Sequence, residues 1–245
     1  MLSKPKISFI KSLQVKKYRQ AEQCFLIQGA KAVHETLASD FEILTLLGTN
    51  EFLNSIDTTI LGKVKEIIEV SEKELTAVGS VETNNSTLAV VRMPAQRKPE
   101  LSPADFSLVL DDIRDPGNLG TIIRTAEWYG IKNIIASPET TDQYNPKVIS
   151  ATMGSFLRLS VYYTGLVEFL KNVSMPVYGT FLTGENIHTV TFVTGALIVI
   201  GNESKGISSS VEKFITHRIT IPRYGNAESL NASTATAIVL DNLRR

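Results

Sequence analysis

The chain has 245 residues, of which 43% are hydrophobic and 20% charged, a balance typical of a globular protein with one large or two small domains. Its formal net charge of zero argues against nucleic-acid binding through bulk charge alone, and its single cysteine, Cys24, excludes an intrachain disulfide. The three histidines show no metal-ligand spacing, and no apolar run approaches the ~20 residues of a membrane span, so we expect no metal, no membrane partner and a cytoplasmic location.

The N-terminal 19 residues are basic and contain no acidic side chain. The cations are Lys4, Lys6, Lys11, Lys16, Lys17 and Arg19. Such a run is either a solvated helix face or an arm that contacts phosphates, and the local pattern alone favours the solvated face.

The first half predicts a small α/β unit. Strand patterns occur at 25–27, 41–47, 66–70 and 86–91, with a helix at 29–37. Residues 93–105 hold three prolines and no apolar periodicity, which is typical of a linker. We therefore expect domains at 1–95 and 105–245, joined by a linker at 96–104.

The second half alternates short strand patterns with helical ones, which predicts parallel strands joined by helical crossovers. The expected strands lie at 106–113, 133–136, 177–181, 196–201 and 218–221. The expected helices lie at 119–129, 144–153, 165–172, 208–215 and 231–243. In such sheets ligands bind beyond the carboxyl ends of the strands.

Three common enzyme motifs are absent from these strand ends. The turn after 106–113 has only Gly117 and Gly120, too few for a dinucleotide-binding fingerprint. In "GNESKG" (201–206), Lys205 precedes Gly206 rather than Ser or Thr, so it is not a P-loop. Ser204 stands one position too late for a nucleophile elbow.

The polar residues near these ends also have local structural interpretations. Asn118 is suited to cap the helix that follows it, and Ser229 or Asn231 to cap the last helix. Arg124 has Glu127 at i+3 as a potential surface partner. Caps do not explain why three strand ends in one half all carry dense polar and glycine clusters, whereas a composite site does.

The three clusters together resemble the SpoU (TrmH-like) family of RNA ribose 2′-O-methyltransferases, within the SPOUT class. The matching segments are "DPGNLGTIIRTAEWYGI" (115–131), "IVIGNESKGIS" (198–208) and "ITIPRYGNAESLNASTATAIVL" (219–240). They occur in the family's order over about the last 140 residues. The segments "VKKYRQAEQCFLIQGAKAVHE" and "STLAVV" resemble the family's L30e-like substrate-binding module.

The resemblance implies an α/β fold whose parallel sheet ends in a C-terminal trefoil knot, preceded by a small L30e-like domain. It implies S-adenosylmethionine as cofactor and a homodimer with active sites near the shared interface. The family's pocket maps onto Thr180, Leu182, Gly201, Ile221 and Leu230. It also favours RNA contact for Lys16, Lys17 and Arg19.

The resemblance further implies methyl transfer to a ribose 2′-hydroxyl. The family's motif arginine matches Arg124; since a guanidinium is protonated at neutral pH, we expect it to orient the ribose or phosphate and stabilise negative charge rather than act as a base. Asn118 and Asn231 are expected to hold Arg124 and the ribose, Glu203 to orient the site, and Ser229 to contact the nucleotide. Small departures from the family pattern, Thr121 and the "NAST" of 231–234, affect packing more than chemistry.

Large-subunit ribosomal RNA is the expected substrate, by family analogy. Three alternatives remain at this point: a transfer-RNA 2′-O-methyltransferase, a non-catalytic RNA-binding or ribosome-assembly protein of the same fold, and a ribosomal L30e-like binder with an unrelated α/β domain.

Overall fold

The computed structural model describes residues 2–79 and 85–245, which form two compact units. The N-terminal unit comprises Met1–Ala95 and Tyr144–Leu157, and the C-terminal unit comprises Gln96–Gln143 and Arg158–Arg245. The segment Tyr144–Leu157 thus packs with the N-terminal unit, although it lies within the range 105–245 of the expected second domain.

The N-terminal unit contains a four-stranded mixed sheet in the order β1-β4-β2-β3. β4 runs antiparallel to both β1 and β2, and β3 runs parallel to β2. The strands are β1 (Cys24–Gln28), β2 (Ile43–Gly48), β3 (Glu66–Glu69) and β4 (Thr87–Arg92). The helical elements are α1 (Lys4–Ser12), α2 (Lys16–Glu22), α3 (Ala30–Leu37), α4 (Asn50–Asn54), α5 (Thr58–Leu61), α6 (Glu72–Val78), α8 (Pro146–Thr152) and the 3₁₀ turn η1 (Ser155–Leu157). The four strands expected from the sequence are confirmed.

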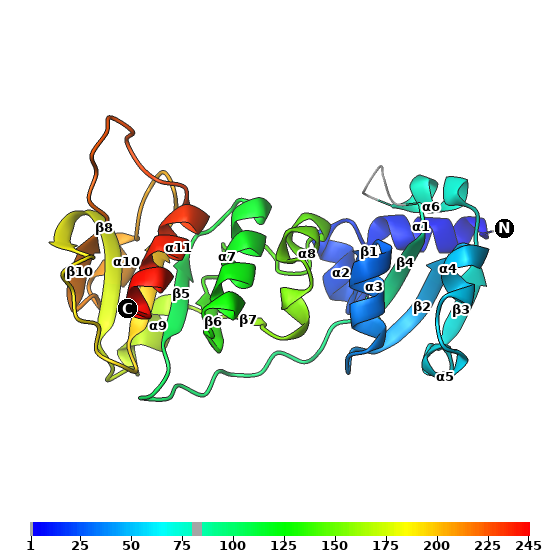
Figure 1. Ribbon diagram of the computed structural model, residues 1–245, viewed down its shortest axis with the longest axis horizontal. Coiled ribbons are helices and arrows are strands. Elements are labelled where there is room, and N and C mark those ends of the chain that lie inside the picture. The colour runs from blue at the N-terminus through cyan, green and yellow to red at the C-terminus, as the bar shows by residue number, and fades with distance from the viewer. Residues whose placement is uncertain (1, 80–84) are drawn as a thin grey trace. The chain divides into compact units, whose positions relative to one another are not determined.

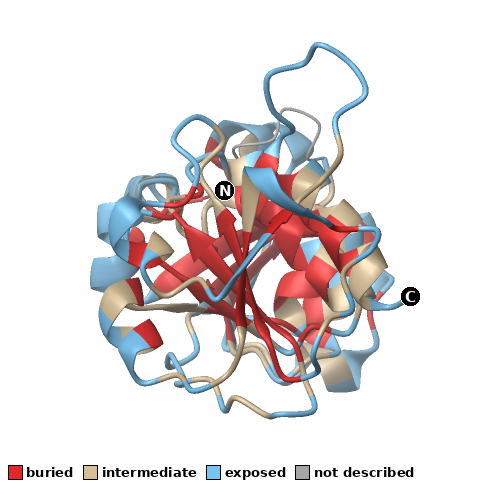
Figure 2. Ribbon diagram, turned by 90° about the vertical axis from the view of Figure 1, so that its left-hand side faces the viewer, coloured by how far each residue is buried: buried red, intermediate tan, exposed pale blue. Residues whose placement is uncertain are grey.

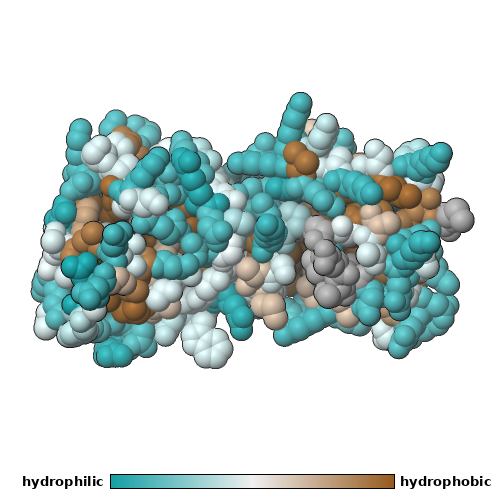
Figure 3. Space-filling view, turned by 90° about the horizontal axis from the view of Figure 1, so that it is seen from above, coloured by the Kyte–Doolittle hydropathy of each residue, from teal (hydrophilic) through white to brown (hydrophobic). Residues whose placement is uncertain are grey.

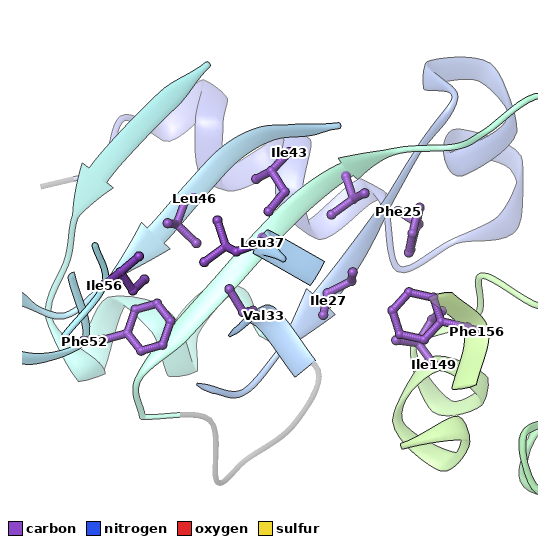
Figure 4. Packing of buried hydrophobic residues seen from close by; sticks show 12 residues of the cluster. Phe25, Ile27, Val33, Leu37, Ile43, Leu46, Phe52, Ile56, Ile149 and Phe156 are labelled. Carbon is purple, nitrogen blue, oxygen red and sulfur yellow. The ribbon is translucent and has the colours of Figure 1, made fainter. Parts of the chain in front are cut away.

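Three strands of the N-terminal sheet, β1, β2 and β4, are buried on both faces, whereas the edge strand β3 is mostly exposed. Successive side chains of a strand point to opposite sides, so each buried strand contributes to two apolar clusters. From β1, Phe25 and Ile27 join one apolar cluster, whereas Cys24 and Leu26 join the other. Figure 4 shows Ile149 and Phe156, from α8 and η1, beside Phe25 in the first cluster. The Cys24 thiol is buried and its pKa is raised by desolvation, as expected of a structural cysteine.

The C-terminal unit is built on a six-stranded, entirely parallel sheet in the order β10-β8-β9-β5-β6-β7. The strands are β5 (Ser107–Asp111), β6 (Asn133–Ala136), β7 (Val161–Tyr163), β8 (Val177–Asn186), β9 (Leu197–Gly201) and β10 (His217–Thr220). The helices are α7 (Pro116–Trp128), α9 (Leu166–Lys171), α10 (Ser209–Glu212) and α11 (Ala232–Leu243). The parallel sheet and the helices between its strands are confirmed, and the three-residue edge strand β7 was not expected.

Helices cover both faces of this sheet, as near-continuous apolar strands require. Val109, Val199 and Val211 belong to one buried cluster that includes α9 and α10. On the other face, α7 and α11 lie side by side in front of the sheet (Figure 1). Figure 2 shows the strands mostly buried and the outward sides of the helices exposed.

β8 has an irregular middle. Its start pairs with the start of β10, through Gly179 and Arg218, but the next pair joins Glu185 to Ile219. The residues between, 180–184, are therefore bulged out of the ladder with β10. They lie where the sequence expects cofactor contacts.

Each unit presents a largely hydrophilic face with smaller apolar patches in the view of Figure 3. Within the part of the chain that the structure describes, no helix combines the length and the apolar character needed to cross a membrane.

Candidate functional site at the carboxyl edge of the parallel sheet

Two of the three motif segments follow neighbouring strands, β5 and β9, and the third follows β10 at the outer edge of the sheet. Asp111 ends β5 and Gly201 ends β9, and these two residues pair across the sheet. Because the strands are parallel, the segments that follow them leave at the same edge. α7 then starts at this edge, with Asp115 as its cap: the Asp115 carboxylate accepts the Asn118 N–H at 2.8 Å. The expectation that Asn118 itself caps α7 is therefore wrong, and the Asn118 side chain is free for another role.

The Asn118 side chain joins all three segments. Its Nδ2 donates to Glu203 Oε1 at 2.6 Å, and its Oδ1 accepts a hydrogen bond from Asn231 Nδ2 at 2.6 Å. Asn118 is only 8% exposed, whereas Glu203 is half-buried and Asn231 is exposed, so the network runs from a buried amide to the protein surface. An ionised carboxylate only accepts hydrogen bonds, which fixes the Asn118 amide with its nitrogen toward Glu203.

Asn231 links this network to the last helix. Its Oδ1 accepts the N–H groups of Ser233 and Thr234, at 2.8 and 3.2 Å, and so caps α11. The cap expected from the sequence is thus confirmed for Asn231. Its Nδ2 remains available for Asn118, so one side chain both starts α11 and connects it to α7.

Ser233 also belongs to this network, although the sequence does not predict it. Its hydroxyl is within 2.6 Å of Asn231 Oδ1 and 3.3 Å of Asn118 Oδ1, and the residue is 9% exposed. The sequence signal for Ser233 is its place two residues after Asn231, within the "NAST" segment.

The loop that carries Glu203 folds back sharply after β9. Asn202 and Gly206 exchange two backbone hydrogen bonds, of 3.1 and 2.8 Å. A Cβ at Gly201 would lie 2.3 Å from the Gly206 carbonyl carbon, so only glycine permits this approach. The half-buried Glu203 is thereby held on a tight loop opposite Asn118.

Arg124 and Ser229 stand apart from the network. Both are exposed, and among residues 2–79 and 85–245 neither side chain forms a hydrogen bond or ion pair. The expected pairing of Arg124 with Glu127 is wrong, because Glu127 forms its ion pair with Arg158. The Arg124 guanidinium therefore faces solvent with its donors available to a ligand.

The five candidate cofactor residues lie on segments at the carboxyl edge. Thr180 and Leu182 are in the bulged part of β8, and the Thr180 hydroxyl donates to the Val199 carbonyl of β9 at 3.2 Å. Ile221 follows β10, and Leu230 precedes the α11 cap. Leu182 and Leu230 are 78% and 44% exposed, which is unusual for leucine side chains.

The basic residues of the N-terminal unit divide into two groups. Lys16 and Lys17 are exposed at the start of α2. Arg19 is 1% exposed, and its Nη1 donates to the Leu13 carbonyl at 2.9 Å. The expectation that Arg19 contacts RNA is not supported by its position, because its guanidinium lies in the core and joins α2 to the end of α1.

The described residues contain no cluster of side chains suited to bind a metal ion. Within them, no three His, Cys, Asp or Glu side chains gather in a way that would hold a metal ion. The side chains at the carboxyl edge supply amides, carboxylates, hydroxyls and the Arg124 guanidinium.

These features define a class of protein: an α/β protein whose parallel sheet carries a polar site assembled from three segments, with a second α/β unit in the same chain. The chain belongs to the SpoU rRNA Methylase family, which matches residues 105–241, and residues 4–89 match the MRM3-like substrate binding domain. The family resemblance drawn from the three motifs is confirmed.

Similar proteins span nearly the whole chain. The 23S rRNA (guanosine(2553)-2′-O)-methyltransferase RlmP of Bacillus subtilis is 32% identical over 245 residues, which covers 98% of this chain and 96% of that protein. A TrmH-family protein of Porphyromonas gingivalis is similar in structure, with a TM-score of 0.89, 34% identity and coverage of 99% and 98%. The AdoMet-bound rRNA methyltransferase of Sinorhizobium meliloti gives a TM-score of 0.90 at 26% identity, with coverage of 100% and 95%.

Proposed function

We propose that this chain is an S-adenosylmethionine-dependent RNA 2′-O-ribose methyltransferase that acts on large-subunit ribosomal RNA. The observation that carries the proposal is the buried Asn118 amide, which joins Glu203 and Asn231 from two other segments at one sheet edge. The substrate named for the Bacillus subtilis relative supports ribosomal rather than transfer RNA.

The carboxyl edge fits S-adenosylmethionine in two respects. The exposed leucines, Leu182 and Leu230, offer apolar contact to a neutral purine ring. The close approach of the 202–206 loop at Gly201 brings backbone groups rather than side chains to this point of the edge. We assign Thr180, Leu182, Gly201, Ile221 and Leu230 to cofactor binding. When bound, the cofactor supplies a methyl group on a sulfonium to the ribose 2′-hydroxyl.

The other site residues act on the ribose side. Arg124, with no protein partner in the described residues, orients a phosphate or the ribose and stabilises negative charge that develops on the attacking oxygen. We assign it no role as the base, because guanidinium groups hold their proton strongly. Asn118, Asn231 and Glu203 hold the ends of α7 and α11 and the 202–206 loop in one geometry, which positions the two reactants. We assign nucleotide contact to the exposed Ser229.

The N-terminal unit is proposed to bind the RNA. Lys16 and Lys17 are its candidate phosphate contacts, because both are exposed and neither has an ion-pair partner within the described part of the chain. We retain domain limits of 1–95, 96–104 and 105–245, and the two family matches support them. An rRNA substrate also supports the cytoplasmic location expected from the sequence.

Two further properties belong to the proposal. A C-terminal trefoil knot is supported by the strand order: the chain passes to the outer edge with β10 and returns through 221–231, the orange loop of Figure 1, to α11 beside α7. A homodimer is supported by Trp128, which is 85% exposed and lies four residues after Arg124 on the same face of α7. Pairing through this face would bring Arg124 to the interface.

Methyl transfer from radiolabelled S-adenosylmethionine to purified ribosomal RNA tests the activity. The proposal expects label in large-subunit rRNA, in a nucleoside whose 2′-hydroxyl is methylated. Label in transfer RNA alone would favour the transfer-RNA alternative. Cofactor binding without transfer to any RNA would favour the non-catalytic alternative, and no cofactor binding at all would favour an L30e-like binder.

A further inference from the structure

The loop that carries Glu203 is tied to the end of β5 at two points. Near the start of the loop, Asn202 Nδ2 donates to the Asp112 carbonyl at 2.8 Å. At its exit, the Ser208 N–H donates to Asp111 Oδ2 at 2.8 Å. Asp111 is only 6% exposed, and the hydrogen bond from Ser208 gives this buried carboxylate a partner, as buried polar groups require.

Asn202 also organises the loop from within. Its Oδ1 accepts the N–H groups of Ser204 and Lys205, at 2.9 and 3.1 Å. The same amide therefore shapes the turn with its oxygen and holds the turn against β5 with its nitrogen. Asp, which is the same size, would keep the acceptor oxygen but would lose the N–H donor.

The β5 side of this contact has an unusual backbone. Asp112 has a φ of +60°, a left-handed conformation that is costly for most residues but tolerated by Asp. Its N–H donates to Ser137 Oγ at 3.1 Å, and its Oδ1 accepts from Arg114 Nε at 2.7 Å. The residue is thus held on several sides, and its carbonyl meets Asn202. Strained backbone that is held by its surroundings is common where geometry matters for function.

The two ties place Glu203 relative to Asn118. Glu203 directly follows Asn202, and α7, which carries Asn118, is capped by Asp115 only three residues after Asp112. Both residues of the 2.6 Å contact, Asn118 and Glu203, are therefore held by segments that are anchored at the end of β5.

We propose that Asn202 and Asp111 are positioning residues for methyl transfer: they set the place of Glu203 against Asn118 and do not themselves touch the substrate. This inference rests on the proposed function. A misplacement of about 1 Å in a catalytic arrangement can lower the rate ~100-fold. We therefore expect the loss of either tie to lower kcat and to leave substrate binding nearly unchanged.

The test compares Asn202→Ala with Asn172→Ala, a matched control. Asn172 also donates through Nδ2 to a backbone carbonyl, that of Glu168, at 2.8 Å, but at the exposed end of α9. For Asn202→Ala we expect kcat to fall by about 10- to 100-fold, with the KM for RNA and the Kd for S-adenosylmethionine within about twofold of wild type. For Asn172→Ala we expect all three constants to stay at the wild-type value.

Two conservative substitutions separate the ties from general loss of structure. Asn202→Asp keeps the acceptor for Ser204 and Lys205 but loses the donor to Asp112, so its kcat should be as low as that of Asn202→Ala. If Asn202→Ala does not fold, Asn202→Asp replaces it in the test. Asp111→Asn keeps an acceptor oxygen for the Ser208 N–H and should retain most of kcat, whereas Asp111→Ala should not.

A readout independent of turnover is the NMR signal of the Asn118 side-chain amide. We expect it to shift in Asn202→Ala and in Asp111→Ala, and to stay in place in Asn172→Ala. Wild-type kcat and an unmoved Asn118 signal in folded Asn202→Ala and Asp111→Ala would overturn the inference, as would equal losses of kcat and of cofactor binding. An inactive wild-type protein would instead overturn the proposed function, while the Asn118 signal would still report whether the ties position that side chain.

Discussion

The Asn231 side chain donates to the Asn118 side chain over 2.6 Å, although 113 residues separate the two along the chain. Each side-chain amide both accepts and donates. The Asn231 oxygen accepts the N–H groups that begin α11, and the Asn118 nitrogen donates to Glu203. The hydrogen bonds therefore run in one direction from the start of α11 to a carboxylate. That order requires asparagine, and not aspartate, at position 118.

We expect Asn118→Asp to disrupt this chain. The new carboxylate would face Glu203 and replace a donor with a like charge, at a position where the residue is only 8% exposed. Methyl transfer should be lost, and the free energy of unfolding in urea should fall by about 1–3 kcal/mol.

Asn172→Asp, at the exposed end of α9, is the matched control and should leave both quantities nearly unchanged. Wild-type stability and activity in Asn118→Asp would show that the direction of these hydrogen bonds has no importance.

Much of the C-terminal unit was predictable because its signals are local. Alternating apolar strands and amphipathic helices predict a parallel sheet, and the polar clusters at 115–131, 198–208 and 219–240 predict a site at its carboxyl edge. The membership of Ser233 in that site was not predictable, since nothing in "NAST" shows which hydroxyl turns toward Asn118.

The N-terminal unit shows what local patterns miss. Arg19 belongs to a run of cations and reads as a surface residue, but its burial depends on the contact between α2 and the end of α1. The packing of Ile149 and Phe156 against Phe25 likewise joins segments more than a hundred residues apart. Such contacts depend on tertiary packing and leave no periodic signal in the sequence.

Arg124 should be required for turnover and not for folding. In Arg124→Ala we expect kcat to fall by about 100- to 1,000-fold, because a donor to developing negative charge is removed. The Kd for S-adenosylmethionine, measured by calorimetry, should stay close to wild type, and so should the urea midpoint, since Arg124 has no partner among the described residues.

Arg158→Ala is the control for this experiment. It removes an exposed guanidinium that pairs with Glu127, and exposed ion pairs contribute only about 0–1 kcal/mol. Equal turnover in the two variants would exclude the proposed role of Arg124.

The two lysines of α2 and the nearby arginine should behave differently. Lys16→Gln with Lys17→Gln should weaken RNA binding and lower the slope of log K against log salt by about 1.4–1.8, the value for two lost phosphate contacts. Lys63→Gln with Lys73→Gln removes the same charge from exposed positions elsewhere in this unit and should leave the slope near wild type.

Arg19→Ala should instead lower stability, by about 1–3 kcal/mol, because the Leu13 carbonyl loses a buried donor. A salt slope that changes in Arg19→Ala but not in the double lysine variant would reverse these assignments.

The capping box of α6 should make the stability of the protein depend on pH. The Glu74 carboxylate accepts the N–H of Ser71 at 3.0 Å and that of Leu2 at 2.8 Å, and these bonds lower its pKa to about 2. A carboxyl group whose pKa is lowered by folding stabilises the folded state. This contribution is fully present above the pKa of the group in the unfolded chain, near 4.3, and is lost as the pH falls toward 2.

Glu74→Gln should therefore be less stable than wild type at pH 6, and the difference should shrink between about pH 4.3 and 2. Thermal unfolding across this range provides the measurement, with Glu72→Gln, two residues earlier in the first turn of the same helix, as control. A difference that stays constant with pH would show that the capping box does not require the charged form.

The most direct test of the central claim is mass spectrometry of nucleosides from large-subunit ribosomal RNA after incubation with the protein and S-adenosylmethionine carrying an isotopically labelled methyl group. The account predicts a labelled methyl group on a ribose 2′-oxygen with the wild-type protein and its loss with Arg124→Ala. Label on a base, or no label in any RNA while the protein still binds the cofactor, would contradict it.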